Sequence, residues 1–475
     1  MTKKLFLVPA LLLAATVLQA KVEMPSVFSD NMVLQQKANV AIWGTATGKK
    51  LTITASWTRK KTVVTPGEDG KWFTRIETPA AGGPYEICFN DGEKTILRNV
   101  LIGEVWLCSG QSNMQMPLRG WRGQPIEHAT DVIMAAKPQV PIRLFDVKTT
   151  IATKPSTKIE DRWKENTPEA LYNFSATAYF FALKLHEILG IPVGVITADR
   201  GGSPIEAWMS REILENEFPG EFNTSVLDTE TAETIHFKSP AIYYNGMLSP
   251  IKPYTFKGII WYQGEDNRMR PEQYTRLQPR FVKMLREEFE NPDAPFYFVQ
   301  IAPYKYTYPE SFNSGYFYEA QQKTLALIPR SGMVPTVDLG SYNFIHPPKK
   351  MEVGYRLAMH ALVNDYGITG VNPVAPTYKS VKFEDGKAIV TVDIDEGVGL
   401  LPAKVPVSGF DVAGEDRVFH PATATAFGQE ITIRSDEVSA PVAVRYCFRN
   451  WCEGTLFSVN SIPLLPFRTD SWNDL

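Results

Sequence analysis

Predicted strands and helices alternate between residues 101 and 368. Short apolar runs with the length of buried strands are followed by stretches with helical spacing, such as Ser175–Leu189 and Pro271–Phe289. Parallel strands need crossover connections of this kind, so the alternation predicts a mostly parallel sheet with ligand-binding residues beyond the carboxyl ends of its strands. The other elements predicted here are strands at Val105–Cys108, Ile142–Val147, Pro192–Ala198, Gly258–Tyr262, Phe296–Ile301 and Met333–Val337, and a helix at Lys350–Tyr366.

The segments on either side of this region show strand patterns alone. Residues 21–100 contain short alternating runs such as Val40–Trp43 and Tyr85–Phe89, separated by turn residues, and residues 369–475 contain Ala388–Asp393 and Glu430–Arg434. A chain of 475 residues is long enough for two or three domains. We therefore expect a flavodoxin-like α/β domain at 101–368, flanked by β-sandwich-like domains at 21–100 and 369–475.

The first twenty residues have the pattern of a secretory signal peptide. Lys3 and Lys4 precede an apolar run from Leu5 to Leu18, and Gln19-Ala20 ends it. No later segment approaches the roughly 18 apolar residues of a membrane helix. We expect a secreted or periplasmic protein that is not inserted in the membrane after signal cleavage. A formal net charge of −3 gives no reason to expect nucleic acid as a partner.

The four cysteines do not suggest a metal site. Cys447 and Cys452 are close enough in sequence to close a small disulfide loop in an oxidising compartment, whereas Cys88 and Cys108 lie in apolar strand patterns and are expected to be buried thiols. Because no Cys/His spacing resembles a zinc site, we expect no metal.

Chemistry-bearing residues follow four of the predicted strands. Ser112 lies on a tight turn directly after Val105–Cys108, where α/β hydrolases place a nucleophile. Since the carboxyl ends of parallel strands meet at one edge of the sheet, we expect the groups after the other strands to lie near it. These groups are Gly201-Gly202, then Gln263, Glu265 and Asn267, and finally Asp338 and His346.

Together these residue types are what acyl transfer needs. Ser112 would be the nucleophile, and His346 the base that accepts its proton near neutral pH. The backbone N–H of Gly202 or Gly201, and the side-chain amide of Gln263 or Asn267, can stabilise the oxyanion. Each residue alone also fits a turn or a surface charge, but their placement at four strand ends favours catalysis.

The motifs around these residues resemble those of sialate O-acetylesterases, which are SGNH-type serine esterases. The resemblance runs over nearly the whole chain after the signal peptide. It implies removal of O-acetyl groups from sialic acids or other sugars, without metal or organic cofactor, with Ser112 as nucleophile and His346 as base. The motifs that carry it are Gly110-Gln-Ser-Asn-Met114, Gly201-Gly-Ser-Pro-Ile-Glu-Ala-Trp208, Tyr244-Asn-Gly-Met247, Trp261-Tyr-Gln-Gly-Glu265, Ile345-His-Pro347 and Pro466-Phe-Arg-Thr-Asp470.

The sequence departs from the SGNH pattern behind the predicted base. Those enzymes usually carry Asp three residues before the His, where this chain has Asn343. An amide stabilises an imidazolium less well than a carboxylate does. The first candidate for the acid is Glu265, because related carbohydrate acetyl esterases use the Glu of Gln-Gly-Glu in this way. Asp338 is the second candidate, and a Ser–His dyad supported by Asn343 is the third.

The substrate expected from the resemblance is an O-acetylated sialic acid. Arg119, Arg122 or Arg200 can pair with its carboxylate, although each also fits a surface charge. An acetyl esterase for plant polysaccharides such as acetylated xylan is the first alternative, because loops around the site set the substrate. A non-catalytic carbohydrate-binding protein with a decayed site is the second.

Overall fold

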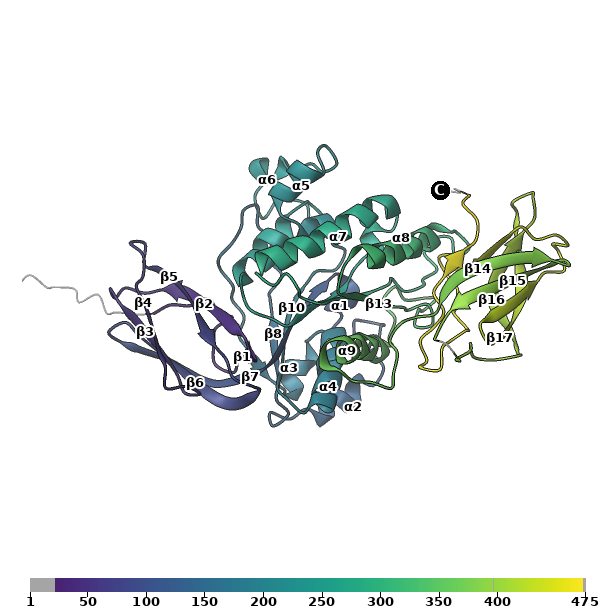
Figure 1. Ribbon diagram of the computed structural model, residues 1–475. Helices are drawn as coiled ribbons and strands as arrows, with labels where there is room; N and C mark the ends of the chain where they lie inside the picture. Colours follow the sequence, from purple (N-terminus) through teal and green to yellow (C-terminus); the bar gives the residue numbers. More distant parts are fainter. Residues whose placement is uncertain (1–21, 396, 473–475) are drawn as a thin grey trace, which may run out of the picture.

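The chain forms three consecutive parts that lie in a row (Figure 1). The computed structural model describes residues 22–395 and 397–472, so the predicted signal peptide at 1–20 lies outside the described residues. A β-rich part at the N-terminal side and another at the C-terminal side flank a central part in which helices cover a sheet. None of the helices in the described ranges is both long and apolar enough to cross a membrane.

The central sheet is parallel, as the alternation of strands and helices predicts. Strand β7 (Lys94–Gly110) lies in its middle, with β11 (Gly258–Tyr262) on one side and β10 (Val193–Asp199) on the other. The chain order reverses around β7, which makes its carboxyl end a switch point of the topology. Outward from these three lie β12 (Phe296–Val299), β13 (Ser331–Val334), β8 (Ile142–Asp146) and the short antiparallel β9 (Lys164–Glu165).

Helices cover both faces of this sheet because its strands are apolar on both. In β7, Val105 and Leu107 belong to the core on one face, and Trp106 and Cys108 to the core on the other. Helices α4 (Ala176–Leu189) and α9 (Lys350–Tyr366) pack together on the second face, and α7 (Pro271–Glu288) and α8 (Asn313–Leu327) on the first (Figure 1). The shorter helices are α1 (Ser112–Gln115), α2 (Ala129–Ala135), α3 (Pro168–Tyr172), α5 (Arg211–Glu217) and α6 (Val226–Thr229).

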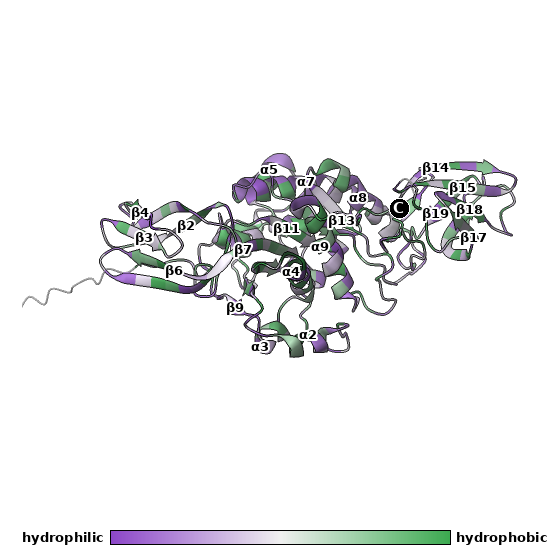
Figure 2. Cartoon of the chain, turned by 60° about the horizontal axis from the view of Figure 1, so that its bottom comes forward, coloured by the Kyte–Doolittle hydropathy of each residue, from purple (hydrophilic) through white to green (hydrophobic). Residues whose placement is uncertain are grey.

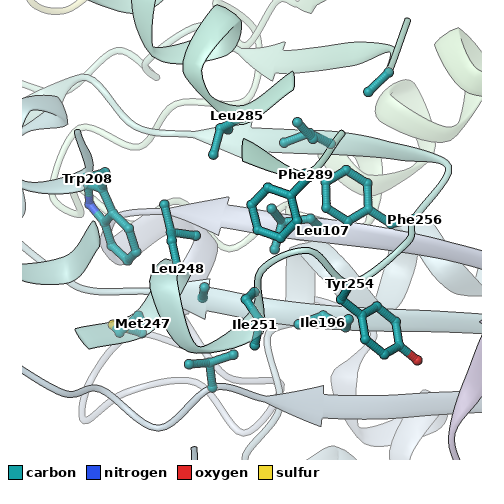
Figure 3. Packing of buried hydrophobic residues seen from close by; sticks show 14 of the residues in the cluster. Leu107, Ile196, Trp208, Met247, Leu248, Ile251, Tyr254, Phe256, Leu285 and Phe289 are labelled. Carbon is teal, nitrogen blue, oxygen red and sulfur yellow. The ribbon is translucent and has the colours of Figure 1, made fainter. Parts of the chain in front are cut away.

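Large side chains fill the space between the first face and the segments that cross it. Leu107 and Ile196 point from neighbouring strands toward Tyr254, Phe256 and Leu285 (Figure 3). Each such residue contributes about 1.5–3 kcal/mol when it is fully buried. By contrast, α5 on the outside of the molecule is hydrophilic (Figure 2). The strand ends of the central sheet are therefore held by a well-packed core.

The helical turns η1 (Ile205–Trp208), η2 (Tyr244–Leu248), η3 (Ser249–Ile251) and η4 (Glu265–Asn267) lie between these elements.

The N-terminal part is joined to the central sheet through one strand. The first half of β7 pairs with β6, and its second half pairs with β10 and β11, so β7 runs across the boundary predicted at residue 100. A separate two-stranded sheet faces this one, with Trp72 lying against Phe89. The strands are β1 (Val33–Gln35), β2 (Asn39–Thr45), β3 (Leu51–Ala55), β4 (Lys61–Val64), β5 (Lys71–Glu77) and β6 (Gly82–Asn90).

The C-terminal part differs from the predicted β-sandwich. Its strands form one seven-stranded antiparallel sheet in place of two facing sheets. The sheet curls so far that its first and last strands meet. Tyr378 of the first strand in the sheet order stacks on Phe467 of the last, with 5.1 Å between ring centroids. In sheet order the strands are β14 (Thr377–Glu384), β15 (Lys387–Asp393), β18 (Glu430–Arg434), β17 (Phe419–Phe427), β16 (Pro406–Ala413), β19 (Ala443–Tyr446) and β20 (Phe467–Arg468).

Candidate active site

Ser112 lies at the carboxyl edge of the central sheet, where β7 turns into α1. Gly110 ends the strand at φ +149°, and a Cβ there would lie 2.1 Å from the carbonyl oxygen of Tyr262, so only glycine fits. The N–H of Gln111 donates to that carbonyl oxygen at 2.9 Å. The turn thus presents a half-buried Ser112 directly above the middle of the sheet.

Asn113, the next residue, connects the Ser112 turn to three other segments. Its Nδ2 donates to Oε1 of Glu265 at 2.6 Å and to the carbonyl oxygen of Ile345 at 3.1 Å. Its Oδ1 accepts a hydrogen bond from Nζ of Lys350, the first residue of α9. Sequence reasoning missed Asn113 and Lys350, because nothing in the local pattern shows that two residues 237 positions apart meet.

Glu265 and Lys350 are opposite charges buried on the two sides of the Asn113 amide. Burial raises the pKa of the Glu265 carboxyl, and the hydrogen bond from Asn113 opposes that rise. Burial lowers the pKa of Lys350 to about 7, although the nearby charge of Glu265 favours the ammonium. We call Glu265, Asn113 and Lys350 the charged network.

His346 lies on the loop before α9, and its hydrogen-bond and ring partners are neutral. Its Nδ1 is 2.8 Å from Oε1 of Gln124. The ring of Trp121 packs edge to face against the imidazole, with 4.6 Å between ring centroids and 81° between the planes. Burial lowers the pKa of His346 to about 4, and the charge of Lys350 lowers it further.

No hydrogen bond joins the reactive atoms of Ser112 and His346 in the described chain. Within residues 22–395 and 397–472, neither Oγ of Ser112 nor Nε2 of His346 has a hydrogen-bond partner. The two residues belong to segments that Asn113 joins, since its amide binds the carbonyl of Ile345, the residue before His346. Sequence reasoning therefore named a serine and a histidine whose loops meet at one edge of the sheet.

The Gly201-Gly202 loop lies against Ser112. A Cβ on Gly201 would be 3.4 Å from Cβ of Ser112, and the N–H of Gly201 donates to Oε1 of Gln115 at 2.9 Å. Gly202 has φ +70°, which favours glycine, and its N–H has no partner in the described part of the chain. Of the two predicted backbone donors, Gly202 is the one that remains available.

The predicted oxyanion roles of Gln263 and Asn267 are not supported by their contacts. Both side chains are fully buried. Nε2 of Gln263 donates to the carbonyl oxygen of Ser203 at 3.2 Å and to Oδ1 of Asn267 at 2.6 Å, while Nδ2 of Asn267 donates to Glu206 at 3.0 Å. The amide N–H groups of Gln263 and Asn267 thus bind neighbouring protein groups. Their contacts hold the loops behind the site together.

Among the described residues, none of the three groups predicted to orient His346 is hydrogen-bonded to it. Glu265 binds Asn113, and both oxygens of Asp338 accept from Arg356 at 2.8 and 2.6 Å. Asn343 is exposed, and its Oδ1 accepts from Lys305 at 3.1 Å. The structure instead places Gln124 at Nδ1 of the imidazole, a residue for which the sequence gives no signal beyond a polar side chain in a loop.

Of the three arginines predicted to bind a substrate carboxylate, Arg122 is exposed, and Arg119 and Arg200 have different surroundings. Nε of Arg119 donates to Oδ1 of Asn173 at 2.8 Å, and its guanidinium lies 5.9 Å from the ring centroid of Tyr172. Arg200 is half-buried directly before Gly201-Gly202, and its charge lowers the pKa of Tyr243 against the larger effect of burial. Arg200 is therefore the arginine adjacent to the site.

One group among the described residues could hold a cation. Ligand atoms of Glu127, His128 and Glu352 all lie within 4.8 Å of one another, and the first two residues are exposed. The acyl-transfer roles of Ser112 and His346 do not involve this group.

Comparisons with known proteins show which family the chain resembles. A family model described as "Carbohydrate esterase, sialic acid-specific acetylesterase" matches residues 102–362. The sialate O-acetylesterases of Pongo abelii and Homo sapiens are each 26% identical to the chain, over 90% of this chain and 88% of each relative. A crystal structure of a carbohydrate acetylesterase from Xanthomonas citri is similar over 95% of this chain and 100% of that one, with a TM-score of 0.84 and 33% identity.

Proposed function

This chain belongs to the sialic acid-specific acetylesterase family of carbohydrate esterases, and we propose that it releases acetate from O-acetylated sialic acids with Ser112 as nucleophile and His346 as base. It is a carboxylic ester hydrolase. The observation that carries the proposed roles is the edge of the central sheet, where Asn113 joins the turn of Ser112 to the loop of His346.

The reaction follows from these positions. Oγ of Ser112 attacks the acetyl carbonyl carbon as Nε2 of His346 takes the hydroxyl proton. The negative charge that develops on the carbonyl oxygen is stabilised by the N–H of Gly202 and by the N–H of Ser112 at the start of α1. The bond to the sugar oxygen breaks, and that oxygen receives the proton from His346. Water, deprotonated by His346, then hydrolyses the acetyl-enzyme.

Glu265 has a different role in this proposal from the one predicted. It acts as a positioning residue through Asn113, because its carboxylate binds the amide that holds the Ser112 turn. Lys350 fixes the other end of the same amide. With donor and acceptor both engaged, Asn113 has one favourable orientation, which keeps Ser112 in place before substrate arrives.

The acid group of the substrate is assigned to Arg200. The residue precedes the loop that lies against Ser112, and its side chain contacts Tyr243, as that of Arg119 contacts Asn173. The predicted leader at residues 1–20 supports export to the periplasm or the exterior, where O-acetylated glycans are available. We also propose that residues 101–368 carry the catalysis and that the two β-rich parts flank it.

Acetate release tests the proposal. Ser112→Ala should lower kcat on p-nitrophenyl acetate by at least about 10³-fold while leaving the thermal midpoint unchanged, because it removes only an oxygen atom that has no partner. Unchanged turnover would rule out Ser112 as the nucleophile.

The substrate class is tested by comparing kcat/KM on O-acetylated sialic acid and on acetylated xylan. Arg200→Gln should reduce the first and spare p-nitrophenyl acetate, with Arg119→Gln as the matched control. A preference for xylan that Arg200→Gln does not alter would assign the enzyme to plant polysaccharides.

A further inference from the structure

Gln124 occupies the position behind His346 where serine hydrolases usually have a carboxylate. Its Oε1 lies 2.8 Å from Nδ1 of His346, and no carboxylate of the described chain is hydrogen-bonded to this imidazole. A side-chain carbonyl oxygen only accepts hydrogen bonds, so the proton of the neutral imidazole lies on Nδ1. Nε2 is then a lone-pair base, as the reaction at Ser112 requires.

The loop that carries Gln124 is built to hold this contact. Trp121 and Gln124 exchange two backbone hydrogen bonds, of 3.0 and 2.9 Å, which close a tight turn. The turn places the Trp121 ring against one side of the imidazole and the side-chain carbonyl of Gln124 at Nδ1 of the imidazole. A Cβ on Gly120, which has φ +70°, would lie 2.4 Å from the backbone carbonyl oxygen of Gln124. The residue at the start of the turn must therefore be glycine.

Backbone contacts on both sides fix the turn relative to His346. Before it, the N–H of Leu118 donates to the carbonyl oxygen of Phe174 at 2.9 Å. After it, the N–H of Glu127 donates to the carbonyl oxygen of Pro348, two residues beyond His346, at 3.1 Å. Because the loops of Gln124 and His346 are bonded to each other, their side chains meet without a large loss of conformational freedom.

We infer that Gln124 is the positioning residue for the base: its neutral side-chain carbonyl fixes the tautomer and orientation of His346, with Trp121 holding the ring, in place of a triad carboxylate. The inference rests on the proposed roles of Ser112 and His346. Its consequence is that orientation is supplied without a negative charge. Among the described residues, Lys350 on α9 is the charged group that acts on the pKa of the imidazole, and Asn113 stands between the Glu265 carboxylate in η4 and the His346 loop. The base therefore stays unprotonated in weakly acidic solution.

Two substitutions separate this role from a purely structural one. Gln124→Ala should lower kcat on p-nitrophenyl acetate by about 10–100-fold with little change in KM, because the imidazole loses its orientation. Gln124→Glu keeps the acceptor and adds a charge, so it should retain kcat at neutral pH. It should also move the acid limb of the kcat/KM profile upward by about one pH unit or more, because an adjacent carboxylate favours the imidazolium.

The control is Asp131→Asn on α2, which removes an exposed carboxylate without a hydrogen bond or ion pair in the described chain. It should not move the acid limb. A direct readout is the ¹⁵N signal of His346, assigned by its absence in His346→Ala. The expected state at pH 6 is the neutral Nδ1–H tautomer, and its titration should shift upward in Gln124→Glu.

Failure of the inference and failure of the proposed function give different results. If Gln124→Ala is as active as the wild type, or if Gln124→Glu leaves both the acid limb and the ¹⁵N titration unmoved, Gln124 does not position the base, and Ser112→Ala still abolishes turnover. If Ser112→Ala remains active, the proposed function itself fails. Thermal midpoints show whether each variant is folded.

Discussion

The two catalytic side chains are supported in opposite ways. His346 is oriented by neutral groups, the Gln124 amide and the Trp121 ring. Ser112 lies above the charged network, in which Glu265 and Lys350 bind the two ends of the Asn113 amide. The charges that other serine hydrolases place behind the histidine are here placed beneath the serine.

Because of this difference, the orientation of His346 and its pKa are set by different groups. A carboxylate at Nδ1 would orient the imidazole and would also raise its pKa. The Asn113 amide binds both the Glu265 carboxylate and the backbone of the His346 loop. Glu265 therefore helps to position that loop, while its negative charge is not in contact with the imidazole. Burial and the charge of Lys350 then keep the pKa of His346 near 4. The enzyme should therefore have a well-oriented but weakly basic histidine.

The largest effect on stability is expected from breaking the charged network. Removing one partner of a buried pair costs about 3–5 kcal/mol, and Lys350→Met should lie near the lower end because Asn113 separates the charges. Adding Glu265→Gln should recover part of the loss, with a coupling free energy of about 1–3 kcal/mol in a double-mutant cycle measured by urea denaturation at pH 6.

The exposed pair of Lys148 and Glu160 is the matched control for this cycle, since both side chains are more than two-thirds exposed, at 71% and 74%. Lys148→Met should change the free energy of unfolding by less than about 0.5 kcal/mol. Strictly additive effects of Lys350→Met and Glu265→Gln would show that the two buried charges do not act through one network.

Asn113 is expected to have the next largest effect, on kcat. Asn113→Ala frees the Ser112 turn from the His346 loop and should lower kcat by about 10²-fold with KM nearly unchanged. Asn113→Asp has the same shape but turns the donor that faces Glu265 and the Ile345 carbonyl into an acceptor. It should not rescue kcat at pH 7. A near-normal Asn113→Asp enzyme would mean that shape alone matters here.

The central fold was predictable because its signals are local and repeated. Strands such as Gly258–Tyr262 are apolar throughout, and α7 begins and ends within one residue of the prediction. Helix α8 gave no such signal, since it buries three consecutive aromatic residues, Tyr316, Phe317 and Tyr318, and so has no clear apolar stripe. The full length of β7 was also missed, because its first half has the mixed pattern of an edge paired with β6.

The site was predictable only in part, because only some of its residues carry a local signal in the sequence. Ser112 and His346 follow strand ends, and their chemistry is distinctive enough to be noticed in a sequence. Gln124 is one polar residue in a loop, and its partner lies 222 positions away. Whether an amide such as Gln263 faces a substrate or a neighbouring loop depends on such long-range contacts, which no local pattern encodes.

The pH profile should reveal the neutral setting of His346. Protonation of Nε2 removes the base, so a pKa near 4 means that kcat/KM on p-nitrophenyl acetate stays flat from about pH 6, where Lys350 is charged, to about pH 5 and falls at lower pH. A histidine with an ordinary pKa of about 6.5 would have lost about 30-fold at pH 5.

Lys350→Met sharpens this test, because it removes the positive charge that faces the imidazole. The acid limb should move upward, but less than in Gln124→Glu, since burial contributes more than Lys350 to the low pKa. An acid limb near pH 6.5 in the wild type would show that the imidazole keeps its ordinary pKa, and the contrast between the two sides of the site would be lost.

The smallest effect is expected from Trp121, which orients the imidazole by ring contact alone. An edge-to-face contact of this kind is worth about 0.5–1.5 kcal/mol, so Trp121→Leu should lower kcat by about 3–10-fold, whereas Trp121→Phe should stay within about twofold. Trp57 makes a similar contact with Tyr85 in the N-terminal part, at 5.5 Å and 69°, and Trp57→Leu is the matched control with unchanged kcat. If Trp121→Leu raised KM and left kcat intact, the ring would contact substrate, and Gln124 alone would hold the base.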